Sequence, residues 1–163
     1  MSDVLSSSAN ICLRLAKKTD EAQLMEWRNL PEIIALGSSQ RAVDPVEHSK
    51  WFAKTLLSEK KRLFVVLWND VPIGQIRFEI QEPRQAEISV FLVKQFTGRG
   101  LGVTTISEGC KLAFVAFPII DCIVAFVRET NLYSLRAFFK AGFETDSQGA
   151  QRTEHVRLRL LRS

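Results

Sequence analysis

A short glycine-rich turn between an apolar run and an amphipathic segment is the strongest constraint on this chain. Residues 90–93 are apolar, Gln95, Gly98 and Gly100 follow in the pattern Gln-x-x-Gly-x-Gly, and an amphipathic segment starts at Leu101. Glycines let a backbone turn sharply, and the free N–H groups at the start of a helix attract an anion. The pattern fits neither a Walker loop nor the fingerprint Gly-x-Gly-x-x-Gly. It therefore indicates either a site for a diphosphate-bearing ligand or a plain strand-to-helix turn.

A second segment strengthens the first interpretation. It reads Asn131-x-x-Ser134 and continues to Lys140-Ala141-Gly142-Phe143. The two segments together cover about residues 86–145 and resemble the acyl-CoA signature of the GNAT superfamily of N-acetyltransferases. The resemblance implies an α+β domain with a mostly antiparallel mixed sheet of about 6–7 strands and about four helices. It also implies a splayed parallel pair of strands that holds acyl-CoA.

Length and composition limit the kinds of protein that this chain can be. With 163 residues, 46% hydrophobic and 25% charged, the chain is long enough for one domain with a real core. We expect this domain at 11–163 and a disordered, small and polar segment at 1–10. No apolar run approaches the ~20 residues that span a bilayer, and no secretory signal is evident, so we expect a cytoplasmic protein without a membrane partner.

Charge and cysteines exclude further roles. The net charge of +4 comes from scattered basic residues, a pattern that does not favour nucleic acid. A phosphate-rich cofactor and an anionic substrate explain the charge equally well. Cys12, Cys110 and Cys122 are isolated in apolar surroundings, so we expect buried reduced thiols and no metal site.

Hydrophobic periodicity predicts the order of the elements. We expect strands at 11–15, 63–68, 71–80, 86–93, 119–127, 144–146 and 153–160, and helices at about 20–29, from 45 onward, at 101–117 and at 131–141. The strands 63–68, 71–80 and 86–93 form an antiparallel meander. The strand 119–127 follows a helix, so it lies parallel to 86–93 through a right-handed crossover.

The resemblance implies an acetyl-CoA site. Backbone groups of Phe91, Leu92 and Val93 would bond the pantetheine amides and orient the thioester. Asn131 and Ser134 would contact the pantetheine arm. The pyrophosphate would lie on the backbone N–H groups of the glycine turn and helix start, helped by the positive helix end and the charge of Arg99; these residues are Gln95, Gly98, Arg99, Gly100, Leu101, Gly102 and Val103.

One position departs from the family pattern. Many members have a tyrosine seven residues after the motif asparagine, as the acid toward the leaving thiolate. Here that position is Phe138, which we place at the cofactor, and the only tyrosine, Tyr133, does not match it. A phenyl ring cannot donate a proton, so the thiolate leaves unaided or takes a proton from elsewhere. This departure keeps open a non-catalytic acyl-CoA-binding module.

Two shorter motifs point to the acceptor side. Trp27-Arg28-Asn29, followed by Glu47-His48-x-x-Trp51-Phe52, resembles the GNAT subgroup that acetylates a UDP-linked amino sugar on the way to pseudaminic acid. Core packing explains Trp27, Trp51 and Phe52 as well. Polar groups beside aromatics often line a cleft, so the expected substrate residues are Arg28, Asn29, His48, Trp51 and Arg77.

The expected reaction is direct transfer of acetyl to a primary amine, which must lose a proton. Glu87 is the first candidate for the base, because its strand runs into the cofactor turn and it resembles a glutamate of the amino-sugar enzyme. Glu79 and His48 are the other candidates, and Glu87 is otherwise a solvated strand carboxylate. A nucleotide-linked amino sugar is the favoured acceptor, ahead of a protein N-terminus or an antibiotic. Pairing through edge strands, common in the superfamily, would give a homodimer.

Overall fold

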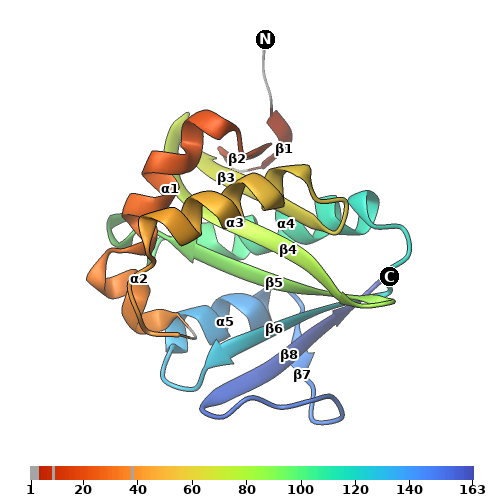
Figure 1. The fold of residues 1–163 in the computed structure, drawn as a ribbon. Coiled ribbons are helices and arrows are strands. Elements are labelled where there is room, and N and C mark those ends of the chain that lie inside the picture. Colours follow the sequence, from red (N-terminus) through yellow and green to blue (C-terminus); the bar gives the residue numbers. More distant parts are fainter. Residues whose placement is uncertain (1–3, 9, 38) are drawn as a thin grey trace.

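The computed structural model describes residues 4–8, 10–37 and 39–163, and it shows one sheet with helices on both faces (Figure 1). The sheet has eight strands in the order β1-β2-β3-β4-β5-β6-β8-β7. The strands are β1 Val4–Ser8, β2 Ile11–Leu15, β3 Lys61–Trp68, β4 Val71–Glu82, β5 Gln85–Leu92, β6 Cys122–Arg128, β7 Glu144–Thr145 and β8 His155–Leu161. The helices are α1 Glu21–Arg28, α2 Pro31–Leu36, α3 Pro45–Leu57, α4 Leu101–Ala116 and α5 Leu132–Lys140.

The pairing of β5 with β6 sets up the site. It is the one parallel pair of the described sheet, and it joins only Gln85–Ile88 to Cys122–Ala125. Beyond Ile88, β5 continues against β4 alone, and β6 continues against β8 alone. The two strands consequently diverge toward their C-terminal ends, as Figure 1 shows. The predicted parallel pair, its antiparallel neighbours and the α+β class are confirmed.

Two apolar layers hold the helices on the sheet. On one face, α4 and α5 bury the larger core against β2 to β6 and β8, with Ile76, Phe78 and Ile123 fully buried. On the other face, α1 and α3 bury a smaller cluster that includes Trp27 and Phe52. Figure 1 shows that α3 crosses in front of β3 and β4, while β6 and β8 lie below it with that face open. The sheet face is therefore half covered.

Local sequence explains where the key helices begin. Asp44 accepts hydrogen bonds from the backbone N–H groups of Val46 and Glu47, and Pro45 occupies the first position of α3. Asn131 caps α5 in the same way, because its Oδ1 accepts from the N–H of Ser134 at 3.2 Å. Both starts agree with the sequence-based prediction.

Some elements differ from the prediction. Residues 4–8 form β1 against β2, whereas we expected disorder over 1–10; residues 1–3 and 9 lie outside the described residues. Helix α2 was also not predicted, because Pro31 suggests a chain break, but proline is well accommodated at the first position of a helix. The described chain thus has one more strand and one more helix than the upper expected counts.

Further expectations concern cysteines and membranes. All three cysteines are free, and Cys110 is buried, while Cys12 and Cys122 are half-buried. Burial raises the pKa of the Cys110 thiol far above its usual range. Among the described residues, no group of three or more His, Cys, Asp or Glu could hold a metal ion. Within the same residues, no helix has the length and apolarity needed to cross a membrane.

Candidate active site

The glycine turn lies at the diverging end of β5. Gly98 and Gly100 have φ values of 75° and 77°, in the left-handed region that favours glycine. A Cβ atom at either position would have no heavy atom within 4 Å, so the turn is open on its outer side. Helix α4 begins at Leu101, and the first N–H groups of a helix have no acceptor within it. The geometry is that of an anion cradle beside the gap between β5 and β6.

The end of β5 is pressed against β4. A Cβ atom on Gly74 of β4 would collide with the carbonyl oxygen of Phe91 and would lie 2.9 Å from Cα of Leu92. The N–H of Val93 donates to the carbonyl of Ile73 at 2.7 Å. That N–H is consequently engaged, so a pantetheine amide at this point would have to use other groups of the segment 91–93.

Helix α5 flanks the other side of the gap. Asn131 uses its side-chain oxygen to cap this helix. Phe138 is 2% exposed, and its ring packs edge-on against Phe143 with centroids 4.9 Å apart. Phe138 therefore belongs to the core, and it provides no polar atom at the position where many family members have tyrosine. Its contact with a cofactor, like that of Asn131 and Ser134, remains a prediction.

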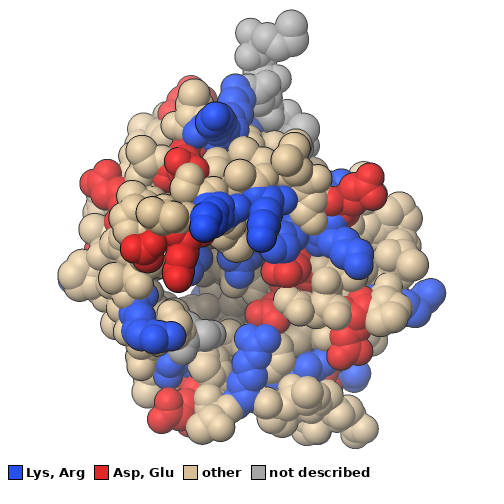
Figure 2. All heavy atoms as spheres, in the orientation of Figure 1, with Lys and Arg blue, Asp and Glu red and all other residues tan. Residues whose placement is uncertain are grey.

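A pocket of about 210 Å³ lies on the opposite face of the sheet, between α1, α3 and β4. Figure 2 shows this face hollowed below α3, with basic and acidic side chains around the hollow. The structure brings four of the five predicted substrate residues to this pocket. Its lining consists of Arg28, Val43, Glu47, His48, Trp51 and Arg77.

His48 is buried between aromatic rings without polar partners. Its side chain lies against Trp51 and Phe52, with ring centroids at 5.5 and 6.0 Å. The residue is 3% exposed, and neither ring nitrogen has a hydrogen-bond partner among residues 4–8, 10–37 and 39–163. Burial lowers the pKa of His48, and the nearby charge of Arg28 lowers it further. The neutral imidazole is therefore favoured, with a donor and an acceptor available to a ligand.

Two arginines meet in the same pocket. Arg28 ends α1, and Arg77 lies in β4, where its guanidinium donates to Ser89 Oγ at 3.4 Å and lies 5.2 Å from the Trp51 ring. Neither forms an ion pair with a carboxylate among residues 4–8, 10–37 and 39–163. Burial lowers the pKa of Arg28, and the charge of Arg77 lowers it further. Burial also lowers the pKa of Arg77, and the charges of Glu79 and Glu87 partly offset this.

Asn29 has a supporting position. Its Oδ1 accepts from the N–H of Val43 at 2.7 Å, and its Nδ2 donates to the Val43 carbonyl at 3.3 Å. Since Val43 lines the pocket, Asn29 fixes one pocket wall through both ends of its amide. Contact of Asn29 with a substrate remains a prediction.

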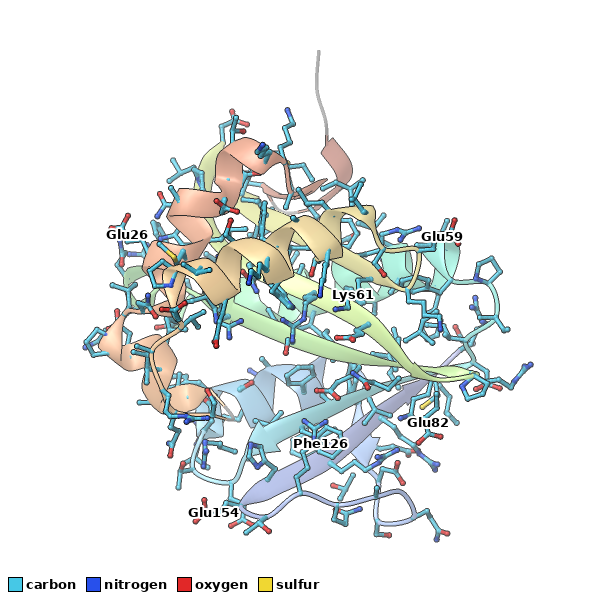
Figure 3. The ribbon with its side chains drawn as sticks, viewed as in Figure 1. Glu26, Glu59, Lys61, Glu82, Phe126 and Glu154 are labelled. Carbon is cyan, nitrogen blue, oxygen red and sulfur yellow. The ribbon has the colours of Figure 1, made fainter. Side chains whose placement is uncertain are left out.

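Glu87 and Glu79 face each other across β5 and β4 and have different partners. Glu87 accepts two hydrogen bonds from Arg152, at 2.7 and 3.1 Å. Glu79 lies 3.6 Å from the ammonium of Lys61. Neither carboxylate is thus a freely solvated strand residue. Figure 3 labels Lys61 on the α3 side of this region and Phe126 on β6.

Arg152 is the residue that sequence reasoning missed. It lies 65 positions from Glu87 in the chain, in the connection between β7 and β8. Its guanidinium stacks on Phe126 at 3.7 Å from the ring centroid. No local pattern around Arg152 gives a signal, because its partner is supplied by the pairing of β5, β6 and β8.

Comparison with known proteins places the chain in a family. The sequence profile of the acetyltransferase (GNAT) domain matches residues 10–144, so the chain belongs to the GNAT family of acetyltransferases, which transfer an acetyl group from acetyl-CoA. No curated protein matches the chain.

Solved structures share the fold at low identity. The aminoglycoside acetyltransferase AAC(6')-Ib, in complex with ribostamycin and coenzyme A, superposes with a TM-score of 0.81 at 22% identity over 94% of both chains. Spermidine N-acetyltransferase from Vibrio cholerae, in complex with CoA and spermine, gives 0.82 at 18% identity over 95% of this chain and 97% of that one. The ribosomal L7/L12 acetyltransferase RimL, with CoA, gives 0.79 at 15% identity over 98% of both. These matches do not single out the amino-sugar subgroup.

Proposed function

We propose that the protein acetylates a primary amine on a small molecule that also carries an anionic group, with a nucleotide-linked amino sugar as the leading example. The observation that carries this proposal is the pair Arg28 and Arg77, which share a partly buried pocket and form no ion pair with a carboxylate in the part of the chain that the structure describes. Guanidinium groups bind carboxylate and phosphate through paired hydrogen bonds. An oxyanion between them would relieve the mutual repulsion of the two charges.

Acetyl-CoA would occupy the gap between β5 and β6. Its pyrophosphate would lie on the turn at Gly98 and Gly100, and its pantetheine arm would run along the backbone of 89–93. Solved neighbours with CoA bound support this arrangement. Replacing Gly98 or Gly100 by glutamate would place bulk and negative charge at the phosphates and abolish binding. Unchanged affinity for acetyl-CoA in calorimetry would contradict the cofactor position.

The reaction then needs few steps. The amine nitrogen attacks the thioester carbonyl, the tetrahedral intermediate collapses, and the C–S bond breaks to give the amide and CoA thiolate. The proton lost by the amine goes to a base, and the thiolate takes a proton from water to leave as the free thiol. Glu87 is the first candidate for the base, and His48, neutral and without partners, is the second.

Single substitutions separate the two candidates. Glu87→Gln is expected to lower turnover while leaving acetyl-CoA affinity intact, because the amide keeps the shape and loses the charge. His48→Gln serves as the matched test of the second candidate. Full activity of Glu87→Gln across the pH range would remove Glu87 from proton transfer.

We expect the acceptor of this chain to differ in charge from the ligands of the similar solved structures. Two of the similar structures are complexes with ribostamycin and with spermine, and both molecules are polycations. The pocket of this chain offers two guanidiniums and one carboxylate, that of Glu47. Polycations would be repelled there, so the amine of the acceptor must belong to a molecule with negative charge elsewhere.

Thiol release from acetyl-CoA tests the proposal directly. UDP-linked amino-deoxy sugars, amino acids, N-terminal peptides, aminoglycosides and spermine would be compared. We expect release with anionic amines, and we expect Arg28→Met to raise the acceptor KM by about 10- to 100-fold. Arg84→Met is the control, because Arg84 is exposed in the turn between β4 and β5 and pairs with Asp121.

Other outcomes identify other functions. Release only with aminoglycosides or spermine would overturn the anionic acceptor, and release only with peptides would favour a protein N-terminus. Tight acetyl-CoA binding with no release on any amine would favour a binding module, for which the buried Phe138 is the relevant observation. A homodimer and a cytoplasmic location stay predictions; light scattering tests the first.

A further inference from the structure

The connection between β7 and β8 is built to place one guanidinium against Glu87. Arg152, in this connection, holds both carboxylate oxygens of Glu87, whose side chain is 17% exposed against 43% for that of Arg152. Exposed ion pairs on a surface contribute little to stability. The carboxylate of this pair is mostly buried, and it lies two residues along β5 from Ser89, the hydrogen-bond partner of Arg77 in the pocket, so the pair calls for another explanation.

A buried arginine, Arg157, holds this connection in place through hydrogen bonds. Arg157 of β8 donates to Asp146 Oδ2 at 2.8 Å, to the Ala150 carbonyl at 3.0 Å and to Gln85 Oε1 at 3.2 Å. The side chains of Arg157 and Asp146 are only 8% and 6% exposed. The hydrogen bonds of Arg157 therefore link the connection to β5, the strand that carries Glu87.

The aromatic ring of Phe126 packs against the guanidinium of Arg152. Its ring has the guanidinium of Arg152 at 3.7 Å and that of Arg157 at 5.4 Å from the centroid. A guanidinium on an aromatic ring is attracted and loses little freedom when it forms hydrogen bonds. The ring comes from β6, one residue past the segment of β6 that pairs with β5. Arg152 therefore links β5 to β6 next to the point where the two strands begin to diverge.

The geometry points to Arg152 as a positioning residue for acetyl transfer, an inference that rests on the proposed function. A carboxylate has about four lone-pair directions, and a guanidinium fork uses two of them. The remaining directions on Glu87 stay available to the amine of an acceptor. By holding both oxygens, Arg152 fixes the plane of the carboxylate, so that the amine is met in one orientation beside the thioester.

Arg152→Ala tests this inference, with Arg159→Ala as the matched control. Arg159 lies on β8, on the same face as Arg157, and it pairs with Glu144 and not with Glu87. We expect Arg152→Ala to lower kcat by about 10- to 100-fold, as a misplaced catalytic group does, with an acetyl-CoA dissociation constant and a melting temperature close to wild type. Arg159→Ala is expected to keep wild-type kinetics.

Rescue distinguishes positioning from structural support. Arg152 is partly exposed, so guanidinium chloride at millimolar concentration should enter the vacated position and restore part of kcat in Arg152→Ala. It should not help Glu87→Gln. Arg152→Lys should recover little, because an ammonium cannot hold both oxygens in one plane.

The outcomes are separable from those of the proposed function. Wild-type kcat in Arg152→Ala, or loss of activity only in proportion to lost folded protein, would overturn the inference. So would additive effects of Arg152→Ala and Glu87→Gln in the double variant, since residues that act through one another are non-additive. Absence of turnover in the wild-type protein on every amine would instead refute the proposed function.

Discussion

The two halves of the sheet face that carries α1 and α3 use arginine in opposite ways. Below β6, the guanidiniums of Arg152 and Arg157 each hold a carboxylate at 2.7–2.8 Å and lie over the same aromatic ring. Below α3, Arg28 and Arg77 approach each other without an ion pair to a carboxylate among the described residues, beside a histidine whose ring has no hydrogen bond there. Because a buried charge without a counterion is costly, we expect an anionic partner from outside at these two arginines.

The largest effect should come from breaking the buried pair on the β8 side. Asp146→Asn leaves the charge of Arg157 buried without its counterion, so the free energy of unfolding should fall by about 3–5 kcal/mol. Urea denaturation measures this loss. Glu144→Gln is the control, since Glu144 and Arg159 are 60% and 35% exposed, and it should cost less than about 1 kcal/mol. Equal losses would remove the distinction between the two pairs.

The same pair predicts a response to acid. The hydrogen bond from Arg157 is the main cause that lowers the pKa of Asp146 below its usual 3.8. A lowered carboxyl pKa adds stability that is present above pH 3.8 and is lost as the pH falls through the value in the folded protein. Asp146→Asn should therefore unfold with a weaker dependence on pH in this acid range than the wild type.

A close backbone contact between β4 and β5 adds a second test of the pocket region. Gly74→Ala would push a methyl group against the carbonyl oxygen of Phe91, so β4 and β5 must separate. We expect a loss of about 1–3 kcal/mol in unfolding free energy, together with weaker binding of acetyl-CoA by calorimetry. Gly37→Ala is the control, because its nearest contacts lie at 3.5 and 3.6 Å. Unchanged cofactor affinity in Gly74→Ala would separate this contact from the site.

Removing an unpaired arginine should have the opposite sign from breaking a buried ion pair. Arg28→Met relieves the repulsion by Arg77 and the cost of burying a charge, so stability should stay the same or rise by about 1 kcal/mol. Arg157→Met should destabilise strongly. Thermal melting of both variants without ligand tests the contrast. A marked loss in Arg28→Met would show that Arg28 has a structural partner after all.

The smallest effect concerns His48. Its pKa is lowered below 6.5 by burial and by Arg28, with Glu21 opposing. A lowered histidine pKa contributes stability that is complete above pH 6.5 and is lost as the pH falls toward the value in the folded protein. His48→Phe should have a flatter stability profile below pH 6.5, as measured by urea denaturation at a series of pH values. Identical slopes would contradict the shift.

Local patterns predicted the parts of the site that one segment builds. The turn at Gly98 and Gly100, the start of α4 and the cap at Asn131 are each encoded within a few residues, and all three agree with the structure. The grouping of Arg28, His48, Trp51 and Arg77 was also expected, because two of their segments resemble one subgroup of the family.

Long-range pairing was beyond such patterns. The ion pair between Glu87 and Arg152 and the hydrogen bond from Arg157 to Gln85 both depend on which strands lie side by side. Helix α2 was missed because a proline can either end a segment or begin a helix. The actual role of Asn29 in holding Val43 follows from the path of a loop, for which the sequence offers no periodic signal.

The early end of pairing between β5 and β6 gives this sheet an edge in its interior. Past Ile88 and Ala125, the backbone groups that face across the gap resemble those of an outer strand, and a strand edge accepts any extended molecule with amides at the right spacing. The gap closes at Ile88, where the pairing of β5 with β6 begins. A pantetheine arm, with its two amides, would then act as the strand that the sheet lacks, and cofactor binding would complete the fold as well as supply the acetyl group.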